Sequence, residues 1–115
     1  MAFKRERLEK IIEREVGTIL LMDVKDDRLH FVTITKVNLT GDLSIATVYY
    51  TILGNPEQIA ATKEVLLEAK GYIKGLLSHR LDIRKIPELI FKYDESSIQG
   101  DRIEEILRQI KREEK

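Results

Sequence analysis

Residues 31–53, FVTITKVNLTGDLSIATVYYTIL, decide the fold. β-Branched and aromatic residues recur with period two in two runs, from Arg28 to Leu39 and from Leu43 to about Leu53. Between the runs, Asn38–Asp42 has the composition of a turn, and Gly41 is able to take a positive φ. Two such runs joined by a short turn predict a β-hairpin.

The segment before the hairpin has helical periodicity. Its apolar residues recur at steps of three and four, which predicts an amphipathic helix from about Phe3 to about Met22. The Asp-rich segment 23–27 ends this helix. The apolar stripe, which we expect to enter the core, consists of Leu8, Ile11, Ile12, Val16, Ile19 and Leu20.

The segment after the hairpin also begins as a helix, with Asn55 as N-cap and Pro56 at the first helical position. Gly71 and Gly75 interrupt its apolar pattern, and a glycine inside a helix costs about 1 kcal/mol relative to alanine. We therefore expect two helices that meet at a kink at Ala69-Lys70-Gly71. One helix that continues straight through is the alternative.

Two further elements complete the pattern. Ile86–Tyr93 predicts a third strand, with Pro87 near its beginning, where proline is tolerated. Asp101 and Glu104 have the spacing of a capping box and predict a short last helix. The apolar residues of this helix are Ile103, Ile106, Leu107 and Ile110.

The order helix–strand–strand–helix–kink–helix–strand–helix predicts the α+β class, with a three-stranded sheet packed against helices. The sequence contains no repeat or linker. We therefore expect one domain over residues 1–110 and a short charged tail over residues 111–115.

Composition excludes several kinds of chemistry. The 115 residues include no cysteine, which excludes disulfides and a cysteine nucleophile and fits a reducing cytoplasm. Neither a signal peptide nor an apolar run long enough to span a membrane is present. His30 and His79 are far apart and belong to no catalytic or metal-binding motif. We expect no enzyme activity, no catalytic or metal-binding residue and no cofactor.

Charge is polarised along the chain although its net value is zero. Between Ala69 and Pro87 five cations accompany one carboxylate, whereas the segment from Tyr93 to Glu105 carries five carboxylates and one cation. The five cations of the basic segment are Lys70, Lys74, Arg80, Arg84 and Lys85.

The basic segment is a candidate phosphate-binding site. Lys70 and Lys74 are four residues apart and would share a helix face beside the amide groups that a second helix exposes at Gly71. An ordinary solvated face remains the alternative. The ring of Tyr72 could stack on a base or pack on the sheet, and packing is favoured. A second basic cluster, at the amino terminus, contains Lys4, Arg5, Arg7 and Lys10.

Several short motifs in a fixed order resemble those of one family. In the first half these are Asp27-Arg28-Leu29, Val32-Thr33-Ile34-Thr35, and Asp42-Leu43-Ser44 with Ala46 and Val48-Tyr49. In the second half they are Ala69-Lys70-Gly71, Arg84-Lys85-Ile86-Pro87-Glu88-Leu89 with Phe91 and Asp94, and Gly100-Asp101-Arg102-Ile103. Together they resemble the ribosome-binding factor A family, whose fold is a type II K-homology (KH) domain.

This resemblance implies a function. It implies an Ala-x-Gly kink in place of the Gly-x-x-Gly loop of ordinary KH domains. It also implies non-catalytic binding to the small (30S) ribosomal subunit and its 16S rRNA during late maturation and rRNA processing, importance in the cold, and functional links with assembly GTPases. Two departures stand out: Asp27 occupies a place where the family has proline, and Gly75 a place where it has a longer, often basic residue.

Two alternatives remain open. The acidic segment from Tyr93 to Glu105 could dock a basic protein, which would make the chain a protein-interaction module. We expect a monomer, although a hairpin surface with Ile45 and Tyr49 could support a dimer.

Overall fold

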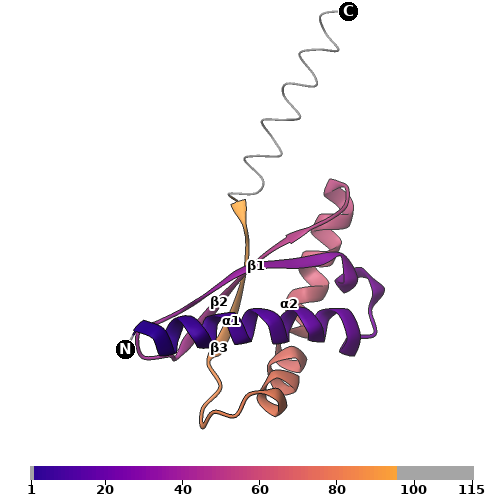
Figure 1. The fold of residues 1–115 in the computed structure, drawn as a ribbon. Helices are drawn as coiled ribbons and strands as arrows, with labels where there is room; N and C mark the ends of the chain where they lie inside the picture. The colour runs from indigo at the N-terminus through magenta and orange to yellow at the C-terminus, as the bar shows by residue number, and fades with distance from the viewer. Residues whose placement is uncertain (1, 96–115) are drawn as a thin grey trace, which may run out of the picture.

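The computed structural model describes residues 2–95. Two long helices accompany a three-stranded sheet (Figure 1). In chain order the elements are α1 (Ala2–Thr18), η1 (Ile19–Asp23), η2 (Asp27–Phe31), β1 (Val32–Leu39), β2 (Ile45–Ile52), α2 (Pro56–Arg80) and β3 (Glu88–Tyr93). The η1 element is a π-helical turn and η2 a 3₁₀ turn.

The sheet has the order β1-β2-β3. β1 and β2 form the predicted antiparallel hairpin, and β3 is parallel to β2. A parallel pair requires a crossover connection, and α2 supplies it. The hairpin, the third strand and the α+β class predicted from the sequence are thus confirmed.

The hairpin turn adopts its positive φ at Leu43, with φ 63°, and not at Gly41 as expected. Hydrogen bonds explain why a leucine can hold this conformation, which L-residues rarely adopt. Asp42 Oδ1 accepts bonds from the hydroxyls of Thr40 and Ser44, both at 2.7 Å. The Thr40 hydroxyl oxygen also accepts a bond from the amide of Ile45 at 3.1 Å.

At acidic pH, the stability of the fold should depend on whether the Asp42 carboxyl is ionised. Hydrogen bonds from Ser44 and Thr40 lower the pKa of Asp42 from 3.8 to about 2. Because the pKa of Asp42 is lower in the folded protein than in the unfolded chain, the ionised carboxylate stabilises the fold. This stabilisation is complete above pH 4 and is lost as the pH falls towards 2. Asp42→Asn should therefore lower the thermal unfolding midpoint at pH 7 and converge with the wild type near pH 2. A difference that is constant across pH 2–7 would contradict this account.

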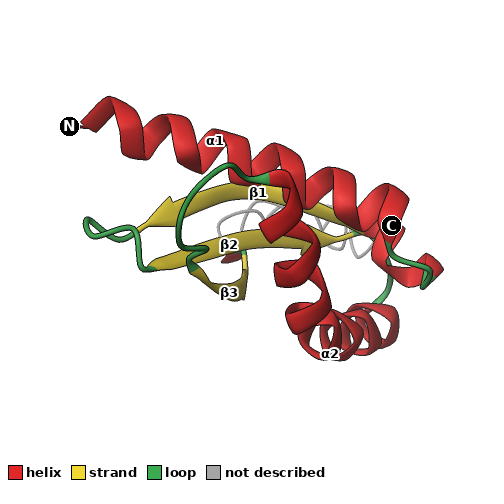
Figure 2. Cartoon of the chain, turned by 90° about the horizontal axis from the view of Figure 1, so that it is seen from below, coloured by secondary structure: helices red, strands yellow, loops and turns green. Residues whose placement is uncertain are grey.

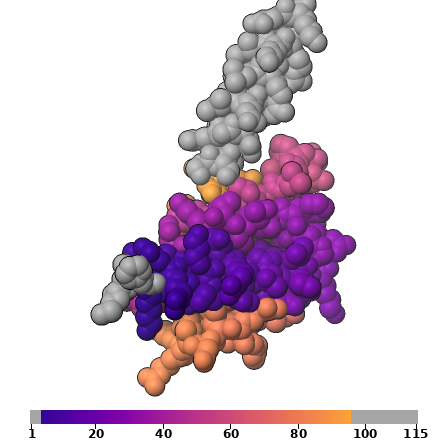
Figure 3. Space-filling model, viewed as in Figure 1, coloured from indigo at the N-terminus to yellow at the C-terminus, as the bar shows by residue number. Residues whose placement is uncertain are grey.

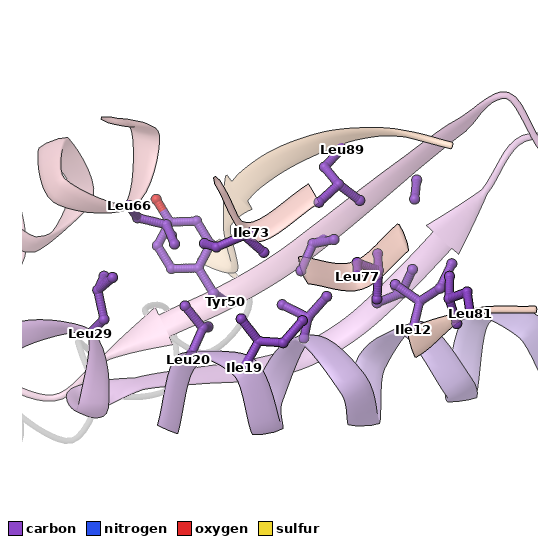
Figure 4. Packing of buried hydrophobic residues seen from close by; sticks show 14 of the residues in the cluster. Ile12, Ile19, Leu20, Leu29, Tyr50, Leu66, Ile73, Leu77, Leu81 and Leu89 are labelled. Atoms are coloured by element: carbon purple, nitrogen blue, oxygen red, sulfur yellow. The ribbon is translucent and has the colours of Figure 1, made fainter. Parts of the chain in front are cut away.

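One face of the sheet carries the core (Figure 4). Along β2, Ala46, Val48, Tyr50 and Ile52 are buried while the residues between them are half-buried. The predicted apolar stripe enters this core: Leu8, Ile12 and Val16 of α1 and Ile19 and Leu20 of η1 are buried, and Ile11 is partly buried.

The α2 helix begins as predicted. The Asn55 side chain accepts a bond from the Gln58 amide at 2.8 Å, and the Gln58 side chain accepts one from the Asn55 amide at 2.8 Å. This capping box, with Pro56 in the first turn, fixes the start of the helix.

The expected break into two helices is wrong, because Pro56–Arg80 is one continuous α-helix of 25 residues. Figure 2 shows that this helix bends along its length. Leu66, Ile73 and Leu77 are all fully buried, so one face of the helix enters the core on both sides of Gly71. Because no second helix begins at Gly71, no second N-terminus offers amide groups to a phosphate there.

Gly71→Ala should stabilise the protein. A Cβ at this helical position would meet nothing within 4 Å, and the same is true of Gly17 in α1. We expect each alanine to raise the free energy of unfolding by roughly 0.5–1 kcal/mol, measured in urea. If Gly17→Ala stabilises and Gly71→Ala destabilises, the bend of α2 requires glycine at position 71.

The predicted last helix and the tail over 111–115 lie outside the described residues. Among residues 2–95, no helix is long and apolar enough to cross a membrane.

Candidate nucleic-acid interface

Three segments far apart in the sequence meet at one end of the molecule. They are the first turns of α1, the β1–β2 turn and the loop between α2 and β3. In Figure 3 the orange surface of this loop projects directly below the indigo start of α1. The three segments enclose a groove of about 560 Å³. We call it the basic groove; its lining is Lys4, Leu8, Asp42, Leu43, Ser44, Asp82, Ile83, Arg84, Lys85 and Pro87.

Three of the predicted phosphate-binding cations line the basic groove: Lys4, Arg84 and Lys85. All three are exposed, and none forms an ion pair with another described residue. Asp42 and Asp82 also line the groove, and the low pKa of Asp42 keeps it charged above about pH 2. The three cations therefore attract an anionic ligand, and the two carboxylates repel a ligand whose negative groups lie beside them.

Lys70 and Lys74 share a face of α2, as predicted, and both contact Glu88 at the start of β3. Lys74 Nζ lies 2.8 Å from Glu88 Oε2, and Lys70 Nζ lies 3.7 Å from Glu88 Oε1. The hydrogen bond from Lys74, together with both positive charges, lowers the pKa of Glu88. The Glu88 amide donates to the carbonyl of Ser44 at 2.8 Å, and Ser44 lines the basic groove. The two lysines therefore border that groove.

Arg80 has a different environment from the other cations of its segment. Its guanidinium donates to Glu15 of α1 at 3.1 Å and to Asp23 of η1. These hydrogen bonds, Asp23 first, raise the pKa of Arg80. Arg80 thus ties the end of α2 to the end of α1, and a phosphate could bind it only by displacing two carboxylates.

The remaining predicted residues are not gathered at the groove. Arg5 and Arg7 are exposed on α1, on the turns that follow Lys4, and do not line it. The favoured packing of Tyr72 on the sheet is wrong, because its side chain is 58% exposed. A tyrosine on a helix that faces solvent remains available for stacking on a base.

Sequence reasoning missed the acidic partners. The sequence does not identify Glu88, Glu15 and Asp23 as ion-pair partners, because these roles depend on tertiary contacts with Lys70, Lys74 and Arg80. The described residues include no group of three or more His, Asp or Glu side chains that could hold a metal ion. The exposed cations of the basic groove suit it to binding anions.

The fold and this groove define a KH-like domain with a basic end. A model of the family described as ribosome-binding factor A matches residues 4–107. The chain belongs to the ribosome-binding factor A family.

Curated and solved relatives agree with this assignment. The ribosome-binding factor A of Staphylococcus saprophyticus is 47% identical over 110 residues, which cover 96% of each chain. The crystal structure of ribosome-binding factor A from Thermus thermophilus gives a TM-score of 0.67 at 25% identity, over 77% of this chain and 93% of that one. A homology model of the Thermus thermophilus factor, fitted into a cryo-EM map of its 30S complex, gives a TM-score of 0.66 at 25% identity, over 80% and 97%.

Proposed function

We propose that this protein binds the small ribosomal subunit through its 16S rRNA during late maturation, without catalysing a reaction. The basic groove is the contact surface. Lys4, Arg84 and Lys85 bind phosphates there, and Lys70 and Lys74 border the same surface. The observation that carries the proposal is the convergence of Lys4 with Arg84 and Lys85, which are far apart in the sequence, on one exposed groove.

The relatives support the choice of partner. The fitted Thermus thermophilus model, to which this chain is similar, belongs to a complex of the 30S subunit with ribosome binding factor A. Cations from a loop and a helix end suit a structured RNA, because proteins recognise folded RNA largely through its shape and its phosphates. We further propose that the protein acts as a monomer, and the resemblance implies functional links with assembly GTPases. Sedimentation of the free protein at its binding concentration tests the monomer.

Binding to purified small subunits should weaken steeply with salt. Each phosphate that a cation neutralises contributes at most roughly one unit to the slope of log affinity against log salt concentration. Three cations that line the groove and two that border it therefore predict a slope of about −3 to −5 between low and moderate salt. The slope can be measured by co-sedimentation over a salt series. A slope near zero would exclude phosphate contacts as the source of affinity.

A further inference from the structure

A second groove, more apolar than the basic groove, lies between η2 and the first turns of α2. It has a volume of about 580 Å³, and we call it the apolar groove. Its lining is Arg28, Phe31, Leu53, Gly54, Glu57, Gln58, Ala61 and Thr62. Phe31 is 54% exposed and Leu53 is 79% exposed. Single exposed apolar residues are common in proteins, but two large ones that share a groove indicate a surface that another segment covers.

β3 brings the chain to this groove. Tyr93, its last residue, is paired with Tyr50 near the end of β2, and the Asp94 amide donates to the Tyr50 carbonyl at 2.7 Å. Lys63 Nζ lies 4.3 Å from the centre of the Tyr93 ring, and Lys63 follows the groove residue Thr62 in α2. The described part of the chain therefore ends at Glu95, beside the apolar groove.

The next residues have the composition to fill it. Ile103, Ile106, Leu107 and Ile110 recur at helical spacing, so a helix over this segment would have one apolar face. Ten residues lie between Glu95 and Ile106, and an extended chain spans about 3.3 Å per residue, so the segment is long enough to reach a groove beside Glu95.

We propose that residues 103–110 dock their apolar face into the apolar groove and cover Phe31 and Leu53. The proposal is independent of ribosome binding, because none of its residues lines the basic groove.

The absence of cysteine allows a direct proximity test in the full chain. Leu53→Cys combined with Ile106→Cys should form an intramolecular disulfide under mild oxidation. Lys85→Cys combined with Ile106→Cys places one thiol at the basic groove and should react at least 10-fold more slowly. Equal rates for the two pairs would overturn the proposal. Disulfide-linked dimers from the first pair would also overturn it, because they would assign the apolar groove to a second copy.

The absence of tryptophan supplies an independent reporter. Phe31→Trp should emit at a wavelength typical of a shielded indole. Ile106→Asp with Leu107→Asp in the same chain should shift the emission to the red, while circular dichroism shows that the sheet and helices persist. Identical emission with and without the two aspartates would show that the segment does not cover Phe31 and would overturn the proposal.

Discussion

Replacing Arg84 and Lys85 together by glutamate is expected to weaken binding to small ribosomal subunits by about 100-fold. Both side chains are exposed, line the basic groove and form no ion pair with a described residue. A charged hydrogen bond contributes about 1.5–3 kcal/mol, so at the lower end of this range the loss of two amounts to roughly 3 kcal/mol, or a factor of about 100. Equilibrium co-sedimentation at fixed salt measures the loss. The unfolding midpoint should change little, because neither residue belongs to the core.

A matched control separates the groove from net charge. Lys25→Glu with Lys92→Glu reverses the same number of charges at two exposed lysines that lie outside the basic groove. We expect this variant to retain most of its affinity. If both double variants lose affinity equally, binding depends on total charge and the basic groove is not the contact surface.

Ile73→Ala is expected to lower the free energy of unfolding by about 2–5 kcal/mol, the usual cost of truncating a large buried aliphatic side chain. Ile73 is fully buried and lies in α2 beyond Gly71, among the packed residues shown in Figure 4. Domains of this kind have a total stability of only about 5–15 kcal/mol, so the variant should unfold at a much lower urea concentration.

The neighbouring Tyr72 provides the control for this substitution. Tyr72→Ala truncates a side chain that is 58% exposed on the same turn of the helix. This substitution should lower the free energy of unfolding by only about 0.5 kcal/mol, as for ordinary surface substitutions. Equal costs at the two positions would mean that the second half of α2 does not pack into the core.

The hairpin and the helix starts were predictable because their signals are local. Period-two alternation determines which side chains of β2 face the core, and Asn55-Pro56 marks the start of α2 whatever surrounds it. The continuity of α2 was not predictable in this way. A glycine costs about 1 kcal/mol in a helix, whereas burial of a residue such as Ile73 or Leu77 contributes about 1.5–3 kcal/mol. Tertiary packing therefore outweighs the local cost of glycine and keeps α2 continuous.

The candidate site was predictable only in part. The sequence identified Arg84, Lys85 and Lys4 as cations, but their meeting at one groove depends on how α1 lies across the sheet (Figure 1). The ion-pair partners of these cations could not be predicted from the sequence either. Arg80 belongs to the same basic run as Arg84, yet it is held by Glu15 and Asp23, which lie more than fifty residues away.

Site-specific crosslinking tests most directly which end of the domain meets the RNA. Because the chain has no cysteine, Lys85→Cys and Lys25→Cys each give one thiol to carry a photoactivated crosslinker. Each labelled protein is bound to immature small subunits, irradiated, and the attached nucleotides are mapped. We predict strong crosslinks to 16S rRNA from position 85 and few from position 25. Strong crosslinks from position 25 with none from position 85 would contradict the assignment of the basic groove as the RNA-binding surface.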